Sequence, residues 1–297
     1  MVIVSVGAPH QDKDQRMHRG TTIRSWASVL ACTLALAGCG FGAAGGPAPV
    51  MSPAATGTPT TTPATPFTAG AALPPSPLPA GTKYLNPASG RTEVIDPAIT
   101  RSAVLIGDSQ SGGAAGVKSA DTWVVRGLAA QGYTVRFEGN GGTGFVARTS
   151  KAANYPTGLE SGKTLLPYGN PALVVVQGGG NDASQGVADD AILANAARLL
   201  KDLKASYPTS RFLFIGTLAK GATHGGGRRT HVDSLLAGFA KRNGLPFVSV
   251  GDWLTRYGVA GSLADAVHLN ESGHQVLARV LAKQLAAMGL RGPAAAK

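Results

Sequence analysis

The sequence predicts an α/β domain in which a five-stranded parallel sheet lies between two layers of helices. From about residue 100 onward, apolar runs of four to seven residues alternate with segments of helical periodicity. This is the pattern of a parallel sheet covered on both faces. Five such runs and their connections occupy about 190 residues, the length of one domain. A single three-layer α/β/α domain is therefore expected.

The expected strands are five short apolar runs, at residues 103–106, 134–137, 173–176, 212–215 and 247–250. The expected helices lie near residues 121–131, 187–206, 230–243 and 271–288. The last helix is amphipathic; Asn270 directly before it is a typical N-cap residue, and Gly289 after it is a typical helix end. In a sheet of this kind, reactive groups gather at the carboxyl ends of the strands.

The first 38 residues have the layout of a secretory signal. A short basic segment, residues 17–24, precedes residues 25–38, which are uncharged and mostly apolar. This apolar segment has 14 residues, whereas a membrane-spanning helix needs about 20. A cleaved signal is therefore expected. Residues 1–16 are interpreted as an upstream extension, which a misassigned start would explain.

The end of this signal resembles the bacterial lipobox, in which a cysteine is lipidated and becomes the new N-terminus. The matching residues are Leu36, Ala37, Gly38 and Cys39. Cys32 fits less well, because Leu30 places a bulky residue two positions upstream. We predict an extracytoplasmic lipoprotein, anchored to the bacterial cell membrane through acyl chains on Cys39. The alternative is an ordinary secretory signal with an incidental cysteine.

An uncharged, proline-rich segment follows the signal. Residues 40–82 contain no charged residue and ten of the 19 prolines, a composition that favours extended, solvated backbone. We therefore expect a lipidated N-terminus and a disordered tether over residues 39–82. The domain is expected over residues 83–297, with its core at about 100–290.

The charge of the chain is basic but diffuse. The 27 Lys and Arg residues exceed the 16 Asp and Glu residues by 11, yet only 14% of residues are charged and 43% are hydrophobic. That balance excludes a wholly disordered chain. In the domain, the only adjacent basic pairs are Arg228-Arg229 and Lys241-Arg242. Nucleic acid is therefore not favoured as a partner, and attraction to anionic envelope polymers is the simpler expectation.

Residues suited to nucleophilic catalysis stand where the apolar runs end. Gly107-Asp108-Ser109-Gln110 follows the first run, and Gly139 to Gly144, rich in glycine, follows the second. Gly178 to Asp182 follows the third, and Asp265 to His268 precedes the last helix. Serine, histidine and aspartate are the components of an activated hydroxyl nucleophile, and glycines let backbone amides approach a ligand. Together these segments predict a site for catalysis by a hydroxyl nucleophile.

Over residues 102 to about 288, the chain resembles the SGNH hydrolase superfamily, the GDSL-type esterases and lipases. The resemblance implies a flavodoxin-like fold and a catalytic triad of Ser109 as nucleophile, His268 as base and Asp265 as its orienting partner. It also implies an oxyanion hole formed by the Ser109 amide, the Asn181 side chain and one glycine amide; Gly142 is preferred and Gly141 stays open. Gln110 departs from the family pattern, which has Leu there, and this polar neighbour argues against a lipid-type substrate.

The function implied is a secreted, membrane-anchored serine esterase that cleaves a short acyl ester, such as O-acetyl on an envelope glycan. An O-acyltransferase with the same triad is an alternative, as is a non-catalytic surface lipoprotein that binds a glycan or lipid. No cofactor is expected. A metal site is not expected either, because no histidine pair has ligand spacing and the mature chain has no spare thiol. A monomer is expected.

Several other motifs are given weaker interpretations. The glycines of 139–144 fit a dinucleotide fingerprint, but the sequence that follows them is not a clear helix. Residues 158–164 resemble a phosphate-binding loop with one residue too few between its glycines. His224, His231 and Arg228-Arg229 are expected in a loop, either in contact with substrate or solvated. Structural roles are expected for His274, as a cap contact, and for Asp182, as a partner of the glycine loop.

Overall fold

The structure, a computed structural model, describes residues 72–293. The predicted signal, Cys32, Cys39 and the tether up to residue 71 lie outside the described residues. Over the described range, none of the helices combines the length and apolar character needed to cross a membrane.

The predicted parallel sheet is present, and its strand order is β4-β3-β6-β7-β8. All neighbouring strands in it pair in parallel. Its strands are β3 (Ser102–Gly107), β4 (Thr134–Gly139), β6 (Leu173–Gln177), β7 (Phe212–Ile215) and β8 (Phe247–Val248). The five predicted strands are confirmed, although β8 ends two residues earlier than expected. Counted along the chain, the order is 2-1-3-4-5, which is the flavodoxin-like arrangement.

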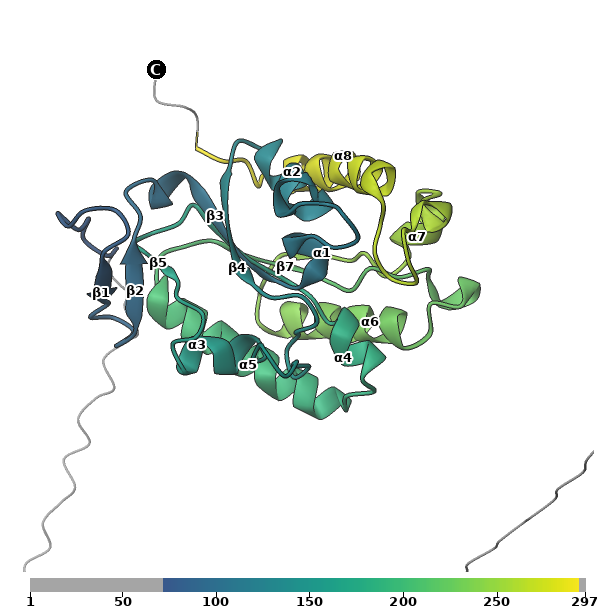
Figure 1. Ribbon diagram of the computed structural model, residues 1–297, viewed down its shortest axis with the longest axis horizontal. Coiled ribbons are helices and arrows are strands. Elements are labelled where there is room, and N and C mark those ends of the chain that lie inside the picture. The colour runs from purple at the N-terminus through teal and green to yellow at the C-terminus, as the bar shows by residue number, and fades with distance from the viewer. Residues whose placement is uncertain (1–71, 294–297) are drawn as a thin grey trace, which may run out of the picture. The chain divides into compact units, whose positions relative to one another are not determined.

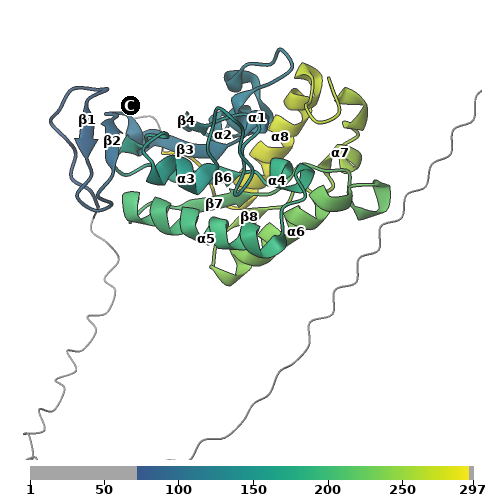
Figure 2. The same cartoon turned by 60° about the horizontal axis from the view of Figure 1, so that its bottom comes forward.

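Helices cover both faces of this sheet (Figures 1 and 2). On one face lie α3 (Tyr155–Glu160), α5 (Asp189–Ser206) and α6 (Gly227–Arg242). On the other lie α2 (Trp123–Ala129), α7 (Trp253–Arg256) and α8 (Glu271–Ala287). The four predicted helices are α2, α5, α6 and α8. Asn270 caps α8 as expected, because its side chain accepts a hydrogen bond from the Gly273 amide at 3.0 Å.

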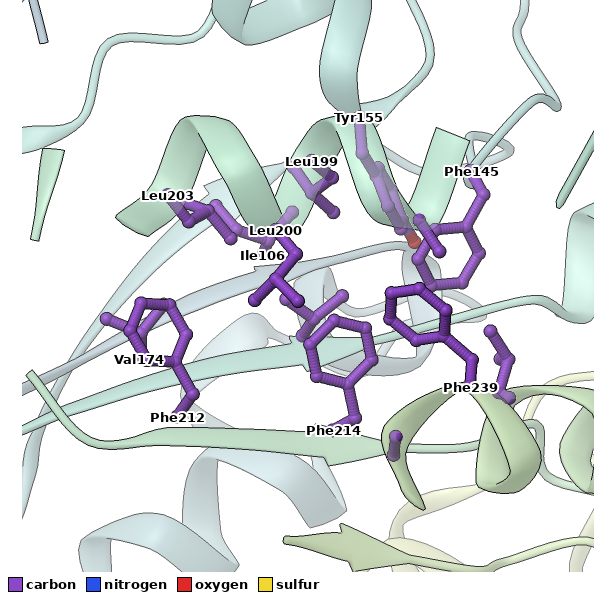
Figure 3. Close-up of a cluster of buried hydrophobic side chains, with 14 of the residues drawn as sticks. Ile106, Phe145, Tyr155, Val174, Leu199, Leu200, Leu203, Phe212, Phe214 and Phe239 are labelled. Atoms are coloured by element: carbon purple, nitrogen blue, oxygen red, sulfur yellow. The ribbon is translucent and has the colours of Figure 1, made fainter. Parts of the chain in front are cut away.

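Successive side chains of a central strand enter different cores. Val104 and Ile106 of β3 belong to the core under α5 and α6, whereas Ala103 and Leu105 belong to the core under α2 and α8. This follows from the two-residue period of a strand. Figure 3 shows the first core, in which Phe214 of β7 packs against Phe239 of α6 with ring centroids 5.7 Å apart. The three layers are therefore held by apolar burial on both sides of the sheet.

A second, three-stranded sheet was not predicted. It has the order β1-β2-β5 and comprises β1 (Lys83–Leu85), β2 (Thr92–Ile95) and β5 (Pro167–Tyr168). Strands of two to four residues are too short to show a hydrophobic period. Leu73 packs beside Ile95 and Tyr168, and its backbone exchanges two hydrogen bonds with the Asn170 side chain. The folded domain therefore includes residues assigned to the end of the tether, because Leu73 has an apolar site to fill.

His274 joins α8 to α2, two helices on the same face of the sheet. It lies in α8, is 2% exposed, and its Nδ1 accepts a hydrogen bond from the amide of Trp123, the first residue of α2, at 3.0 Å. This contact satisfies one of the unpaired amides of the helix N-terminus and confirms the expected cap contact. Burial, followed by the charges of Arg126 and His268, lowers the pKa of His274 from 6.5 to about 4.

We predict that His274 makes the stability of the protein depend on pH between about 6.5 and 4. As the pH falls through this window, the unfolded chain binds a proton at His274 and the folded chain does not, so the free energy of unfolding falls. In His274→Asn, the side-chain oxygen of asparagine replaces Nδ1 as acceptor and does not titrate. The decrease in unfolding free energy that His274 causes is therefore absent from this variant. Urea unfolding of both proteins at pH 7.5 and pH 5 measures the difference.

The matched control is His224→Asn, which removes a histidine from an exposed position. If His274→Asn loses as much unfolding free energy between the two pH values as the wild type does, the assignment is wrong.

Candidate active site

The candidate site lies where the strand order of the parallel sheet reverses. After β3 the chain adds β4 on one side and then β6 on the other, and ligands of such sheets bind at this switch point, outside the carboxyl ends of the strands. Two short helices begin there: α1 (Ser109–Gly112) after β3 and α4 (Gly180–Ser184) after β6. A pocket of about 230 Å³ opens at this edge. It is lined by Asp108, Ser109, Gln110, Gly180, Asn181, Ser184, Arg229, Val267 and His268.

Ser109, His268 and Asp265 form a chain of hydrogen bonds. The Ser109 Oγ and His268 Nε2 are 2.8 Å apart, and His268 Nδ1 and Asp265 Oδ2 are 2.7 Å apart. With the imidazole proton on Nδ1, the ring donates to Asp265 while Nε2 accepts from the serine hydroxyl. The structure thus brings together three residues from parts of the sequence up to 159 positions apart, in the order that hydroxyl activation requires.

The Asp265 carboxylate is fixed by the loop that carries it. Its Oδ1 accepts hydrogen bonds from the amides of Val267 and His268, both at 2.7 Å. The bond from the His268 side chain, then those from the two amides, lower the pKa of Asp265 to about 2. The carboxylate is therefore ionised at any pH at which the imidazole needs an anionic partner.

Asn181 lies beside the serine, with its side-chain amide already oriented. Its Nδ2 donates to the Thr143 carbonyl oxygen at 2.9 Å and to Asp108 Oδ2 at 3.2 Å. The first bond ties α4 to the loop after β4, and the second points Nδ2 toward the residue that precedes Ser109. An amide donor next to a nucleophilic serine is suited to hold a developing oxyanion.

The two candidate glycines differ in their position relative to Ser109. A Cβ added to Gly141 would lie 3.6 Å from the Ser109 Cβ. A Cβ added to Gly142, which has φ +75°, would instead lie 2.8 Å from Thr149 Cγ2. Gly141 is thus the glycine that lies against the serine side chain.

Asp182 holds the glycine-rich loop, as expected. It is fully buried, and its carboxylate accepts hydrogen bonds from the amides of Phe145, Val146 and Ala147 at 2.7–3.0 Å. Only glycine fits at position 144, because an added Cβ would lie 2.1 Å from Asp182 Oδ2. The aspartate is therefore a structural partner of the loop.

Gln110 links the nucleophile to the loop of the base. Its Nε2 donates to the Val267 carbonyl oxygen at 2.9 Å, and its Oε1 accepts from Trp123 Nε1 at 3.3 Å. The side chain is 6% exposed. Sequence reasoning treated Gln110 only as a polar residue beside the nucleophile and missed this bridge. The departure from the usual leucine was the available signal, but its partners are 13 and 157 residues away.

Asp108 also faces the pocket while being almost fully buried. It caps α1, since its Oδ1 accepts from the Gln110 amide at 2.8 Å. Burial is the largest influence on its pKa, which is raised to about 6 against the opposing effects of the Gln110 amide and of Arg229. Both carboxylate oxygens of Asp108 accept hydrogen bonds, Oδ1 from the Gln110 amide and Oδ2 from Asn181 Nδ2. The role of Asp108 is therefore to orient these two residues beside Ser109.

The basic residues after 226 lie in α6, where a loop was expected. Arg228 and His231 both pair with Asp189 at the start of α5, at 2.6 and 2.7 Å, so they connect two helices outside the pocket. The side chain of His224 forms one hydrogen bond among the described residues, with its neighbour Thr223. Arg229, in contrast, lines the pocket. Sequence reasoning did not separate it from Arg228.

The two nucleotide-like motifs are not in nucleotide-binding settings. Residues 139–144 form the end of β4 and a loop, and the next helix begins only at Tyr155. Residues 158–164 span the end of α3 and no strand precedes them directly. Within residues 72–293, no group of three His, Cys, Asp or Glu side chains is placed to bind a metal ion.

The chain is similar to several solved structures, of which the first described here has the same fold. A family two carbohydrate esterase from Clostridium thermocellum, solved as an active-site mutant, has a TM-score of 0.52 and 16% identity, over 66% of each chain. A G-D-S-L family lipolytic protein from Veillonella parvula has a TM-score of 0.48 and 17% identity, over 62% of this chain and 97% of that one. The carbohydrate acetylesterase Est24 from Sinorhizobium meliloti has a TM-score of 0.46 and 20% identity, over 63% and 99%. No curated protein matches the chain.

At sequence level, the model of the GDSL-like Lipase/Acylhydrolase family matches residues 105–276. This range begins inside β3 and ends inside α8, so it contains every residue of the hydrogen-bonded chain described above. Because the match covers more than half of the protein and its conformation is that of the fold expected for SGNH hydrolases, this chain belongs to the GDSL-like lipase and acylhydrolase family and is a hydrolase of carboxylic esters.

Proposed function

We propose that the protein is a serine esterase that forms an acyl-enzyme on Ser109. The observation that carries this proposal is the 2.8 Å contact between Ser109 Oγ and His268 Nε2, with Asp265 bonded to the far side of the ring. His268 takes the serine proton as the oxygen attacks the ester carbonyl, and gives it to the leaving alcohol. In the second half, His268 activates a water molecule that hydrolyses the acyl-serine.

The oxyanion of each tetrahedral intermediate is assigned to three donors: the Ser109 amide, a glycine amide and Asn181 Nδ2. The position of Gly141 against the serine Cβ supports Gly141 over Gly142 for the second donor. Asn181 Nδ2 keeps its 2.9 Å hydrogen bond to the Thr143 carbonyl oxygen, which holds the amide in place. Its second hydrogen bond, to Asp108 Oδ2 at 3.2 Å, is exchanged for one to the oxyanion. Donors fixed before the reaction need no reorganisation during it.

We propose a short acyl group, such as acetyl on a glycan, as the substrate. The pocket volume of about 230 Å³ is below the about 300–1,000 Å³ of sites for drug-sized ligands. Val267 is the only aliphatic residue among the lining residues of the described chain, which offers little apolar surface to a long acyl chain. The Clostridium thermocellum protein of similar fold is a carbohydrate esterase, and a glycan ester is the corresponding substrate for this chain.

We also propose that the enzyme acts outside the cytoplasmic membrane, anchored by lipid on Cys39. The support is the lipobox-like Leu36-Ala37-Gly38-Cys39, placed after an apolar segment of signal length. More than one acyl chain makes such an anchor firm.

For the catalytic assignment, we predict that Ser109→Ala hydrolyses 4-nitrophenyl acetate no faster than the reaction without enzyme, because no nucleophile remains. Asn181→Ala keeps measurable activity that is lower by about 10²–10³, the usual effect of losing one oxyanion donor. A fluorophosphonate probe labels the wild type and Asn181→Ala but not Ser109→Ala.

The control is Ser234→Ala, which removes an exposed hydroxyl on α6 and keeps wild-type activity. Wild-type activity in Ser109→Ala would refute the assignment. A series of nitrophenyl esters tests the substrate size, since maximal kcat/KM at long acyl chains contradicts the short-acyl proposal.

For the anchor, we predict that the full chain, produced in a bacterium, incorporates a labelled fatty acid and sediments with membranes. Cys39→Ala loses both properties, because no thiol remains at the cleavage site, and Cys32→Ala, the matched control, keeps both. Incorporation of the labelled fatty acid by Cys39→Ala, or its absence from the wild type, is incompatible with the proposal.

A further inference from the structure

Arg229 is a cation in the wall of the candidate active site, and the proposed mechanism gives this residue no role. It projects from the start of α6 and lines the pocket together with Ser109, Asn181 and His268. Its guanidinium lies on the backbone of α4, since a Cβ added to Gly180 would be 2.8 Å from Arg229 Nη1. The charge is therefore held beside the residue that precedes Asn181, close to where the ester must bind.

The guanidinium has few protein partners. Its hydrogen bond in the described structure is a long one of 3.3 Å, from Nη2 to Ser184 Oγ, a neutral group that itself donates to the Gly180 carbonyl oxygen. Among residues 72–293, no carboxylate lies within ion-pair distance of Arg229. A guanidinium carries five N–H donors, so most of its donors have no partner in that part of the chain.

The neighbouring Arg228 shows what a structural arginine looks like in the same helix turn. It forms an ion pair with Asp189 at 2.6 Å and donates to the Val187 carbonyl oxygen. Arg228 thus has both a countercharge and a backbone acceptor, and Arg229 has neither. The difference is not explained by exposure, because both arginines are half-buried. Burial also lowers the pKa of Arg229 from its ordinary value, against the opposing effect of Asp108.

Asp108 does not neutralise Arg229. Asp108 is the acid whose charge acts on the pKa of Arg229. Its two oxygens, however, accept hydrogen bonds from the Gln110 amide and from Asn181 Nδ2. The carboxylate of Asp265 is likewise occupied, by His268 and two amides. A partly buried guanidinium without a countercharge is unfavourable, and its planar fork fits a carboxylate through two parallel hydrogen bonds.

We propose that Arg229 determines specificity by binding a carboxylate of the substrate, so that the preferred ester carries a carboxylate close to its scissile bond. The inference deepens the proposed esterase function and rests on it. In this role Arg229 touches the substrate but not the reacting atoms, so it raises the kcat/KM of anionic esters and leaves neutral esters almost unaffected.

The test uses two pairs of esters that differ only in a carboxylate and its neutral amide. In the first pair the group lies on the acyl side: the 4-nitrophenyl monoester of glutarate against 4-nitrophenyl glutaramate. In the second it lies on the alcohol side: O-acetyl-lactate against O-acetyl-lactamide. We expect the wild type to prefer the carboxylate in at least one pair by about 10-fold or more in kcat/KM, the effect of a charge-assisted hydrogen bond. The pair that responds shows on which side of the ester Arg229 lies.

In Arg229→Gln the preference falls to less than about 2-fold, while the kcat/KM of the neutral partner changes by less than about 3-fold, because only the charge-assisted contact is lost. Arg229→Lys keeps part of the preference, since a point charge remains without the fork. The matched control, Arg228→Gln, keeps the wild-type preference. Added salt weakens the preference of the wild type.

A second readout does not need turnover. Glutarate and glutaramide are titrated into the wild type and Arg229→Gln by isothermal calorimetry, and we expect only glutarate to bind, and only to the wild type. Such binding in a protein that hydrolyses no ester supports the inference and contradicts the esterase proposal. Equal kcat/KM within both pairs overturns the inference even in an active esterase. The inference is also overturned if Arg229→Gln lowers the kcat/KM of anionic and neutral esters equally, because that result shows a structural role for Arg229.

Discussion

The parallel pairing of β3 with β4 on one side and β6 on the other is the constraint on which the site depends. Parallel strands end at the same edge of a sheet, so the loops after β3, β4 and β6 leave the sheet together. Ser109, Gly141 and Asn181 each follow one of these strands. Their approach is thus a consequence of strand register. The register is fixed at β3 and β6, because both faces of these two strands are buried under helices.

The register alone does not fix the side chains, and buried polar groups complete the arrangement. Asp182 binds three amides of the glycine-rich loop, and Asn181 binds the Thr143 carbonyl of the same loop. Gln110 extends this network to the segment before α8 that carries His268. Each buried group has its hydrogen bonds, and satisfied networks of this kind hold one geometry rather than several. A hydrolase needs this, because oxyanion donors stabilise charge best when they are already in position.

The charges of the pocket divide into those that are internally satisfied and one that is not. Asp265, Asp108 and Asp182 all accept hydrogen bonds from amides or side chains of the site. Arg229 has only Ser184 among its described partners. The basic excess of the whole chain first suggested an anionic polymer as partner, but within the domain it is spread along the sequence, with Arg228-Arg229 and Lys241-Arg242 as the only adjacent basic pairs. Arg229, a cation in the wall of the same pocket as Ser109, bears more directly on recognition, because its field acts inside that pocket.

Much of this could be predicted from the sequence. The five strands and four of the helices were recognisable because runs of buried residues have a period. Ser109 and Asn181 were recognisable because their short motifs follow strand ends, and Asp265 and His268 because their motif directly precedes the last helix. The two-residue strand β5 and the packing of Leu73 were not, since segments so short show no period. The choice between Gly141 and Gly142, the bridge made by Gln110, and the separation of Arg229 from Arg228 depend on contacts between residues that are far apart in the chain. Sequence patterns report local order and chemistry, and only tertiary structure decides which distant groups meet.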